Sequence, residues 1–444
     1  MSGFEDDAAP ETEGRAVPSG GLTRMARYGV LGAGLIADTL KARAEALAEG
    51  RASDWSDIAF TPNSARRLTD ELARLRGAAL KAGQLISMDA GAMLPAEFAD
   101  AAARLRAAAE PMPPRQLRQV LDARWGTGWL RRFKRFQARP AAAASIGQVH
   151  KAETKDGRTL AIKVLYPGVR RSIDSDIDAL AALIAVSGLV PRGMDLKPLL
   201  AEAKTQLHRE TDYGLEARNL NAYARAVAGD DRFVTPALAE DWCADGVLAM
   251  DWLAGGSIET AADQPRAERE RVFDALVDLT LDELFDLGVM QTDPNFANFL
   301  YAGPNKPIGL IDFGAVQTIP ADISRRYRAV LTAALHGARA DLTDALKQLG
   351  VIAETTPDPH AQAVTDMAER AMAAIRAGEA FDFTDAGLMT QTRDQGEALR
   401  KAGFNHAPPP ALIFIQRKLG GLYLMGARLG IAKDLRPVLD ARLA

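Results

Sequence analysis

The sequence predicts an α+β fold of two lobes: a small antiparallel sheet in the first, a helical second lobe, and a helical extension before both. Strand-like segments joined by short turns are confined to residues 133–252. The segments on either side of them predict helices, interrupted near Pro and Gly. The chain has 444 residues, 48% of them hydrophobic and 25% charged, which is enough for two or three packed units.

The first 132 residues divide into a tail and the helical extension. Residues 1–21 are acidic and rich in Pro, Gly and Ala, which predicts a disordered tail. The extension covers residues 22–132, and its first helix, over residues 22–49, has an apolar middle that contains glycines. Such a helix lies either on a membrane surface or against the rest of the protein, and the second arrangement is the more frequent.

A second helix of the extension is expected over residues 61–88. Lys81 and Gln84 are three positions apart, so they share one face, and apolar residues surround them. If this face is covered, each of the two side chains needs a polar partner, whereas a solvated face requires none. Short helices broken by prolines continue the extension.

The predicted sheet begins with a strand over residues 136–140. A loop of small residues, 141–148, follows it. Strands over residues 149–154 and 159–166 come next, joined by Asp-Gly, which is a typical hairpin turn. Small side chains let a backbone approach phosphate groups closely, although Ala allows less backbone freedom than the more usual Gly.

Lys163 lies on the last of these strands, in Leu-Ala-Ile-Lys, which is similar to the Val-Ala-Ile-Lys of protein kinases. A lysine at a sheet edge is the alternative, and the preceding loop favours a nucleotide site. Two helices are expected next, over residues 174–186 and 199–220. In the second helix Glu216 is the candidate partner of Lys163, because a helix carboxylate holds this lysine on the phosphates in kinases.

Residues 233–238 and 246–252 are expected to complete the sheet, and residues 251–256 to form a hinge that offers backbone groups to adenine. The residues expected to contact ATP come from the loop, the strand and the hinge: Ala143, Ala144, Ser145, Ile146, Gly147, Gln148, Lys163, Met250 and Trp252. The small lobe therefore covers residues 133–252, and residues 253–444 form the helical lobe.

The helical lobe contains two segments that together indicate phosphoryl transfer. Asp293 and Asn298 are spaced like the catalytic-loop Asp and Asn of a protein kinase, and Asp312 begins an Asp-Phe-Gly triplet. In that chemistry the first Asp orients the attacking hydroxyl, and the Asn and the second Asp hold Mg²⁺. Each segment alone is also a common turn sequence, but their order along the chain favours the catalytic interpretation.

Composition excludes several other classes of site. The net charge of −4 gives no reason to expect nucleic acid as a partner. The single cysteine, Cys243, forms neither a disulfide framework nor a cysteine metal site, and the five histidines have no metal-ligand spacing. No stretch approaches the ~20 apolar residues that span a bilayer. We therefore expect a cytoplasmic protein, with peripheral contact to the inner membrane left open.

In this order the motifs resemble those of the UbiB-type atypical kinases, a protein-kinase-like group associated with ubiquinone biosynthesis. The matching segments are Lys81-Ala-Gly-Gln84, the alanine-rich loop 141–148, Glu210-Thr-Asp212, the segment 291–298 and Asp312-Phe313-Gly314, with Glu216 where the family has its lysine-pairing glutamate. The resemblance runs from about residue 60 to past residue 330. It implies a protein-kinase-like two-lobe fold that binds ATP and Mg²⁺, with the extension packed over the active site.

The resemblance also implies that Lys81 and Gln84 meet Glu210 and Asp212 in the groove where a protein kinase takes its peptide. We therefore do not expect protein phosphorylation. Two features depart from many bacterial relatives. Gln291 replaces the His of a His-Gly-Asp, as in the mitochondrial branch, and residues 411–444 are too basic to span a membrane.

Three functions remain open. The first is an ATPase or small-molecule kinase that supports ubiquinone biosynthesis, with a quinone precursor or isoprenoid lipid as a partner. The second is a true protein kinase. The third is a nucleotide-gated scaffold or lipid chaperone without essential phosphoryl transfer, which contacts quinone-biosynthesis proteins and, through residues 22–49, a membrane surface.

Overall fold

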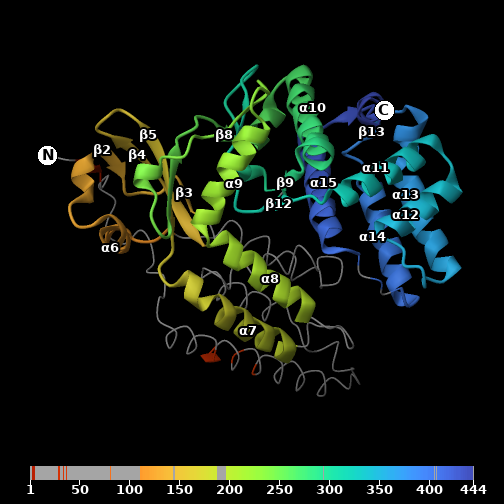
Figure 1. Cartoon of the computed structure of the whole chain (residues 1–444), viewed down its shortest axis with the longest axis horizontal. Helices are drawn as coiled ribbons and strands as arrows, with labels where there is room; N and C mark the ends of the chain where they lie inside the picture. Colours follow the sequence, from red (N-terminus) through yellow and green to blue (C-terminus); the bar gives the residue numbers. More distant parts are fainter. Residues whose placement is uncertain are drawn as a thin grey trace, which may run out of the picture. The chain divides into compact units, whose positions relative to one another are not determined.

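The computed structural model describes residues 3–5, 29–30, 34, 37, 81, 111–143, 146–187, 197–293, 295–404, 406 and 408–443. The chain divides into two compact units. Unit 1 comprises Met1–Arg218 and Ala237–Trp252, and unit 2 comprises Asn219–Pro236 and Leu253–Ala444. Their ribbons can be followed in Figure 1. Of the two helices expected in the extension, only five positions are described, and all five are helical.

Unit 1 is built on one sheet in the order β1-β2-β4-β5-β7, with β3 also paired to β4. The strands are β1 (Gly3–Glu5), β2 (Phe133–Gln137), β3 (Ala142–Ala143), β4 (Gly147–Thr154), β5 (Thr159–Leu165) and β7 (Val247–Asp251). All pairs are antiparallel except β1 with β2. Gly157 closes the β4–β5 hairpin with a φ of 90°, as its Asp-Gly sequence predicts.

Strand β1 differs from the disordered tail that we expected over residues 1–21. Phe4 lies opposite Phe136 of β2, and the other residues of the tail lie outside the described ranges. The physical reason is that an edge strand such as β2 presents unpaired N–H and C=O groups, which an extended segment of any sequence can bind.

The helices of unit 1 are α6 (Pro114–Trp125), α7 (Val169–Ser187), α8 (Lys197–Glu210) and the start of α9 (Tyr213–Ala226), with short 3₁₀ turns η1 (Trp129–Arg132) and η2 (Glu240–Trp242). Aromatic rings from α6, η1, β2 and η2 pack against one another in its core; these are Trp125, Trp129, Phe133, Phe136 and Trp242. This core fixes one end of the sheet.

We expected one helix over residues 199–220, and the structure has two. The chain breaks at Thr211, and the Asp212 carboxylate accepts a 2.9 Å hydrogen bond from the Leu215 N–H as the N-cap of α9. The expectation was wrong because an Asp inside an apolar helical pattern can instead begin a new helix. Asp212 therefore precedes α9 and does not share a helical face with Glu216.

Unit 2 contains a four-stranded sheet in the order β6-β11-β10-β8 and two smaller pairs, β9 with β12 and β13 with β14. The strands are β6 (Phe233–Val234), β8 (Gly256–Ser257), β9 (Val289–Gln291), β10 (Phe299–Tyr301), β11 (Ile308–Leu310), β12 (Val316–Thr318), β13 (Phe381–Asp382) and β14 (Ala432–Lys433). We had placed residues 233–238 in the small lobe's sheet. Leu238 does bridge to Met250 of β7, but residues 233–234 form β6, which runs parallel to β11. Strand-like composition does not specify which sheet a short strand joins.

The helices of unit 2 carry most of its core. They are α10 (Arg266–Asp282), α11 (Ala321–His336), α12 (Arg339–Leu349), α13 (Asp358–Ala377), α14 (Ala386–Lys401), α15 (Pro410–Leu429) and α16 (Arg436–Leu443), with 3₁₀ turns η3 (Ile258–Asp263) and η5 (Phe296–Asn298). Helix α10 ends in a π-helical turn, η4 (Glu283–Leu287). Within the described residues, no helix is both long and apolar enough to cross a membrane.

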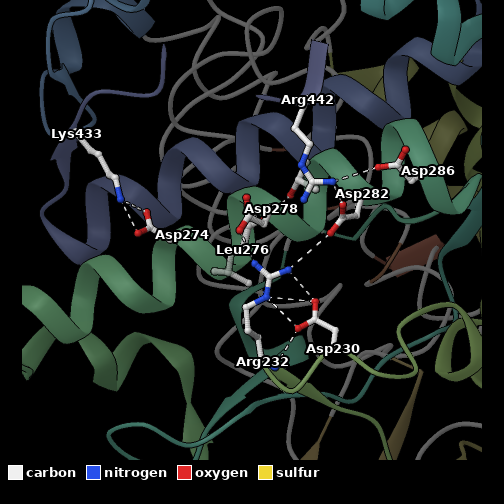
Figure 2. A network of polar contacts seen from close by, with 10 residues as sticks. Asp230, Arg232, Asp274, Leu276, Asp278, Asp282, Asp286, Lys433 and Arg442 are labelled. Carbon is white, nitrogen blue, oxygen red and sulfur yellow. Dashed lines mark hydrogen bonds and ion pairs between the residues drawn. The ribbon is translucent and has the colours of Figure 1, made fainter. Parts of the chain in front are cut away.

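Four carboxylates follow one another at four-residue intervals along α10 and η4, and a cation from elsewhere in unit 2 pairs with each (Figure 2). Lys433 of β14 pairs with Asp274, Arg232 pairs with Asp278, and Arg442 of α16 pairs with Asp282 and Asp286. The C-terminal segment is therefore fastened to α10, the helix that precedes β9.

Candidate active site

The central feature of unit 1 is an ion pair between Lys163 of β5 and Glu216 of α9. Lys163 Nζ lies 2.5 Å from a Glu216 carboxylate oxygen, and the two side chains are only 13% and 5% exposed. In the sheet, Lys163 lies between Val149 of β4 and Leu248 of β7. The pairing that we expected forms, in a setting where removal of either charge would leave the other buried.

A second ion pair, also within unit 1, joins the N-terminal extension to α8. Lys81 Nζ lies 3.2 Å from Glu210 Oε2, and Gln206 donates a 3.1 Å hydrogen bond to the other carboxylate oxygen. The expected contact between Lys81 and Glu210 therefore forms. Gln84 lies outside the described residues, and the Asp212 carboxylate caps α9.

The loop of small residues is described at both of its ends. Ala143 pairs with Gln148 across β3 and β4, Ile146 is buried, and Ala144 and Ser145 lie outside the described residues. At Gly147 a Cβ atom would lie 2.7 Å from the Val164 carbonyl oxygen and 2.9 Å from the Tyr213 hydroxyl. Only glycine fits there, because the neighbouring strand is too close for any side chain.

Gln148, which we expected to contact ATP, has its side chain in the core. Its Oε1 accepts a 2.7 Å hydrogen bond from the Met112 N–H, and its Nε2 donates to His150 Nε2 at 2.8 Å. His150 Nδ1 in turn donates to the Gln137 carbonyl oxygen at 2.9 Å. Burial lowers the pKa of His150 to about 4, so the ring is neutral, as this chain of bonds requires. The side chain of Gln148 therefore holds the end of the loop to the core of unit 1.

The expected hinge begins at the end of β7. Met250 is buried and lies opposite Ala161, and the Trp252 ring stacks under the Lys151 ammonium group at 4.9 Å. The N–H groups of Asp251 and Trp252 already donate to the carbonyl oxygens of Ala237 and Thr159, both at 2.9 Å. A donor to adenine would therefore come from another residue of this segment.

In unit 2, the pairing of β10 with β11 brings Asn298 next to Asp312. Phe299 lies opposite Leu310, and the Ile311 N–H donates a 3.2 Å hydrogen bond to the Asn298 carbonyl oxygen. Asp312 is the next residue, and its Oδ1 accepts a 3.0 Å hydrogen bond from the Gly314 N–H. Two candidate metal ligands that are 14 positions apart in sequence are thus neighbours.

Asp293 lies in the loop between β9 and η5. Its carboxylate accepts a 3.3 Å hydrogen bond from the Asn295 N–H, and its carbonyl oxygen accepts one of 3.3 Å from Asn298 Nδ2. Thr292 anchors the loop, because its N–H and its hydroxyl both donate to the Ala315 carbonyl oxygen, at 3.1 and 2.7 Å. The candidate catalytic loop and the Asp-Phe-Gly segment are therefore held together at both ends.

Sequence reasoning missed the buried polar group behind this loop. Glu283, fully buried at the start of η4, accepts hydrogen bonds from the Tyr223 hydroxyl at 2.7 Å and from the Gln291 N–H at 2.9 Å. Its other oxygen lies 2.8 Å from Lys418 Nζ of α15. Burial, together with the Glu283 charge, raises the pKa of Tyr223 well above 10. In the sequence these residues look like ordinary polar positions of separate helices.

The Asp-Phe-Gly segment is tied to α9 as well. Phe313 is buried, its ring centroid lies 5.4 Å from that of Tyr223, and its carbonyl oxygen accepts a 3.0 Å hydrogen bond from Asn219 Nδ2. Helix α9 therefore carries Glu216, the partner of Lys163, and further along its length the residues that hold Phe313.

The chemistry of Asn298 and Asp312 suits Mg²⁺. Mg²⁺ usually binds one or two protein oxygens and completes its shell with phosphates and water. Asn298 uses its amide nitrogen on the Asp293 carbonyl, so the amide oxygen is its remaining polar atom, and Asp312 supplies a carboxylate. No group of three or more His, Cys, Asp or Glu side chains suited to a metal occurs among the described residues.

Comparison with known proteins gives consistent results. Residues 104–346 match the ABC1 atypical kinase-like domain. The chain is 32% identical over 431 residues to "Atypical kinase COQ8, mitochondrial" of Saccharomyces cerevisiae. The alignment covers 96% of this chain and 85% of that protein. It is 29% identical over 449 residues to "Probable serine/threonine-protein kinase abkA" of Dictyostelium discoideum. That alignment covers 94% of this chain and 78% of the other protein.

A solved structure described as "The complex structure of Rv3197-erythromycin from Mycobacterium tuberculosis" is similar with a TM-score of 0.58 and 26% sequence identity, covering 85% of this chain and 94% of that chain. The matched domain spans more than half of the 444 residues, and the yeast relative aligns along nearly all of them. These matches confirm the kinase-like fold that the motifs predicted. The chain belongs to the ABC1 atypical kinase-like family, that is, to the UbiB-type atypical kinases.

Proposed function

We propose that this protein is a Mg²⁺-dependent, ATP-binding atypical kinase or ATPase that supports the biosynthesis of ubiquinone or a related isoprenoid lipid. The observation that carries the proposal is the buried ion pair between Lys163 and Glu216, 2.5 Å long. Removing both charges from water costs free energy that their attraction offsets only in part, so a buried pair points to a role beyond stability. Positioning a lysine on nucleotide phosphates is such a role.

Each candidate residue has a role in this proposal. Lys163, positioned by Glu216, neutralises charge on the α- and β-phosphates, and Asp293 orients the attacking water or hydroxyl. Asn298 and Asp312 hold Mg²⁺, which, when bound, neutralises charge on the phosphates. Gly147 lets the end of the loop that we propose to cover the nucleotide pack directly against β5.

The link to ubiquinone rests on the family and on the mitochondrial COQ8 relatives. The acceptor of the phosphate is proposed to be water or a lipid hydroxyl. Protein kinase activity is the second candidate, favoured by the name of the Dictyostelium discoideum relative. The contact between Lys81 and Glu210 favours the first candidate, because a helix held there would obstruct a peptide.

Thermal denaturation with ATP or ADP, with and without Mg²⁺, tests the proposal directly. A ligand that binds only the folded state at ~100-fold its dissociation constant adds about 2.7 kcal/mol of stability. We expect Mg²⁺-dependent stabilisation in the wild type and its loss in Asp312→Asn. Asp322→Asn, at an exposed carboxylate of α11, is the matched control and should behave like the wild type.

Turnover assays then separate the candidates. Release of inorganic phosphate that is lost in Lys163→Met and Asp312→Asn supports an ATPase or small-molecule kinase. Transfer of labelled phosphate to a protein in trans would establish the second candidate. If variants without nucleotide binding still restored quinone levels in a null strain, the protein would act as a scaffold, and the proposal would be rejected.

A further inference from the structure

Unit 1 contains a surface pocket of about 620 Å³. Its lining includes Asp212 of the Glu210-Thr-Asp212 segment but none of the residues to which we assign a role in catalysis. The start of α9 lines one side of the pocket, and residues between 238 and 247 line the other. Arg170 of α7 and His208 of α8 complete the lining. Tyr213, Ala217, Leu238 and Val247 make its lining largely apolar, and the half-buried Cys243 also lines it. Its size suits a small organic molecule.

The charged residues of the lining are mainly acidic. Asp212, Glu240 and Asp245 contribute three carboxylates. Arg170 is already engaged, because it pairs with Asp245 at 2.7 Å and donates to the Thr211 carbonyl oxygen at 2.7 Å. Within the described part of the chain, no cationic side chain lies within ion-pair distance of Asp212 or Glu240. Two carboxylates are therefore left to attract a cation from solution.

The walls of the pocket are the two elements that position Lys163. Tyr213 and Ala217 flank Glu216 on α9. The Tyr213 hydroxyl packs against Gly147 of β4, so closely that a Cβ on Gly147 would lie only 2.9 Å from it. On the opposite wall, Val247 begins β7, whose next residue pairs with Lys163 in the sheet. A molecule that separates these walls would shift Glu216 relative to Lys163.

We propose that this pocket binds a small amphipathic organic cation, an apolar body that carries an amine, and that its occupancy regulates the Lys163–Glu216 ion pair. The apolar lining accepts the body, and Asp212 and Glu240 attract the ammonium group. The effect on turnover rests on the proposed function, whereas binding itself does not.

The single cysteine of the chain gives a direct assay of binding. Burial raises the pKa of the Cys243 thiol, so its reaction with N-ethylmaleimide is slow and conveniently followed by intact mass at about pH 8. The probe is 4-phenylbutylamine, and 4-phenylbutanol is its neutral counterpart. We expect the amine to protect Cys243 at about fivefold lower concentration than the alcohol, the factor that weak, partly solvated charge pairs provide.

The double variant Asp212→Asn/Glu240→Gln removes both charges with little change in shape. Asn caps a helix about as well as Asp, so α9 should keep its N-terminus, and circular dichroism checks that the variant folds. In this variant the amine and the alcohol should protect equally. Equal protection by both compounds in the wild type, no protection by either, or a preference for the amine that survives in the double variant would overturn the proposal.

Regulation is tested on the wild type with hydrogen exchange and ATP turnover. The amine, at concentrations that protect Cys243, should change amide exchange in the first turns of α9 and alter turnover at least twofold; the alcohol at equal concentration should do neither. Protection of Cys243 without any change in α9 would overturn the regulatory part. Complete absence of ATP turnover would instead count against the proposed function, because Cys243 protection does not depend on it.

Discussion

Replacing Lys418 with Met tests whether a buried ion pair supports the proposed catalytic loop. Lys418 and Glu283 are 6% and 0% exposed and lie 2.8 Å apart. Methionine has a similar length and no charge, so Lys418→Met leaves the Glu283 carboxylate buried without its counter-ion. Glu283 also accepts the Gln291 N–H at the start of the loop, so its environment bears on the loop itself.

The expected magnitude follows from the partners that remain. Breaking a buried ion pair by removing one partner typically costs about 3–5 kcal/mol. The Tyr223 hydroxyl and the Gln291 N–H still donate to Glu283, which compensates part of the lost charge. We therefore expect a loss of about 3 kcal/mol in the free energy of unfolding of unit 2. Adding Glu283→Gln removes the uncompensated charge, so the double variant should be more stable than the sum of the single effects predicts.

The tryptophans allow the two units to be followed separately. All five lie at or before residue 252 and none lies in Asn219–Pro236, so tryptophan fluorescence during urea unfolding reports on unit 1. Far-UV circular dichroism reports on both units. Lys418→Met should move the circular dichroism transition to lower urea and leave the fluorescence transition in place. Lys401→Met, which breaks an exposed pair with Glu397, is the control and should cost less than about 0.5 kcal/mol.

Either of two results would refute this reasoning. If Lys418→Met lost less than about 1 kcal/mol, as surface pairs do, Glu283 would not depend on its counter-ion and the pair would be incidental. A matching shift in tryptophan fluorescence would also contradict the assignment of the effect to unit 2.

Three further predictions concern unit 1. Because the pKa of His150 is lowered to about 4, the neutral ring contributes fully to stability above about pH 6.5. This contribution, about 3 kcal/mol in total, is lost as the pH falls toward 4. Urea unfolding followed by fluorescence should show the loss, and His150→Gln should make the free energy of unfolding less dependent on pH over this range. Gly147→Ala places a Cβ 2.7 Å from the Val164 carbonyl oxygen and should destabilise the protein by about 1–3 kcal/mol. Gly396→Ala, in a helix with open space around it, should stabilise the protein slightly. Thermal denaturation should therefore show a lower melting temperature for the first variant and a slightly higher one for the second. Asp212→Ala should cost about 1 kcal/mol and Asp212→Asn much less, since only the first removes the cap of α9; equal losses in both variants would contradict the capping role.

The sequence was sufficient for features that depend on local order along the chain. The strand that carries Lys163, its hairpin turn and the spacing of Asp293 and Asn298 are all short-range patterns, and the need of that lysine for a helix carboxylate singled out Glu216. The contact of Lys81 with Glu210 was anticipated only through the family, because no local pattern specifies it.

What the sequence did not reveal depends on tertiary contacts. Lys418 and Glu283 are 135 positions apart, and nothing near either residue marks it as buried. The placement of β6 beside β11 is decided by which sheet edge is available, and a two-residue strand carries too little pattern to choose. The break before α9 was not predicted because its only signal in the sequence is a single residue, Asp212, within an otherwise continuous helical pattern.

The fastening of the C-terminal segment to α10 has a consequence for how unit 2 forms during protein synthesis. Like charges at four-residue spacing destabilise a helix, so α10 emerges from the ribosome with its carboxylates mutually repelling. Arg442 is synthesised 160 residues after Asp282, and Lys433 comes 159 residues after Asp274. Helix α10 and the turn that leads into the proposed catalytic loop therefore reach their final stability only after almost all of unit 2 has been made. The small sheet of unit 1, complete by residue 252, can fold well before that.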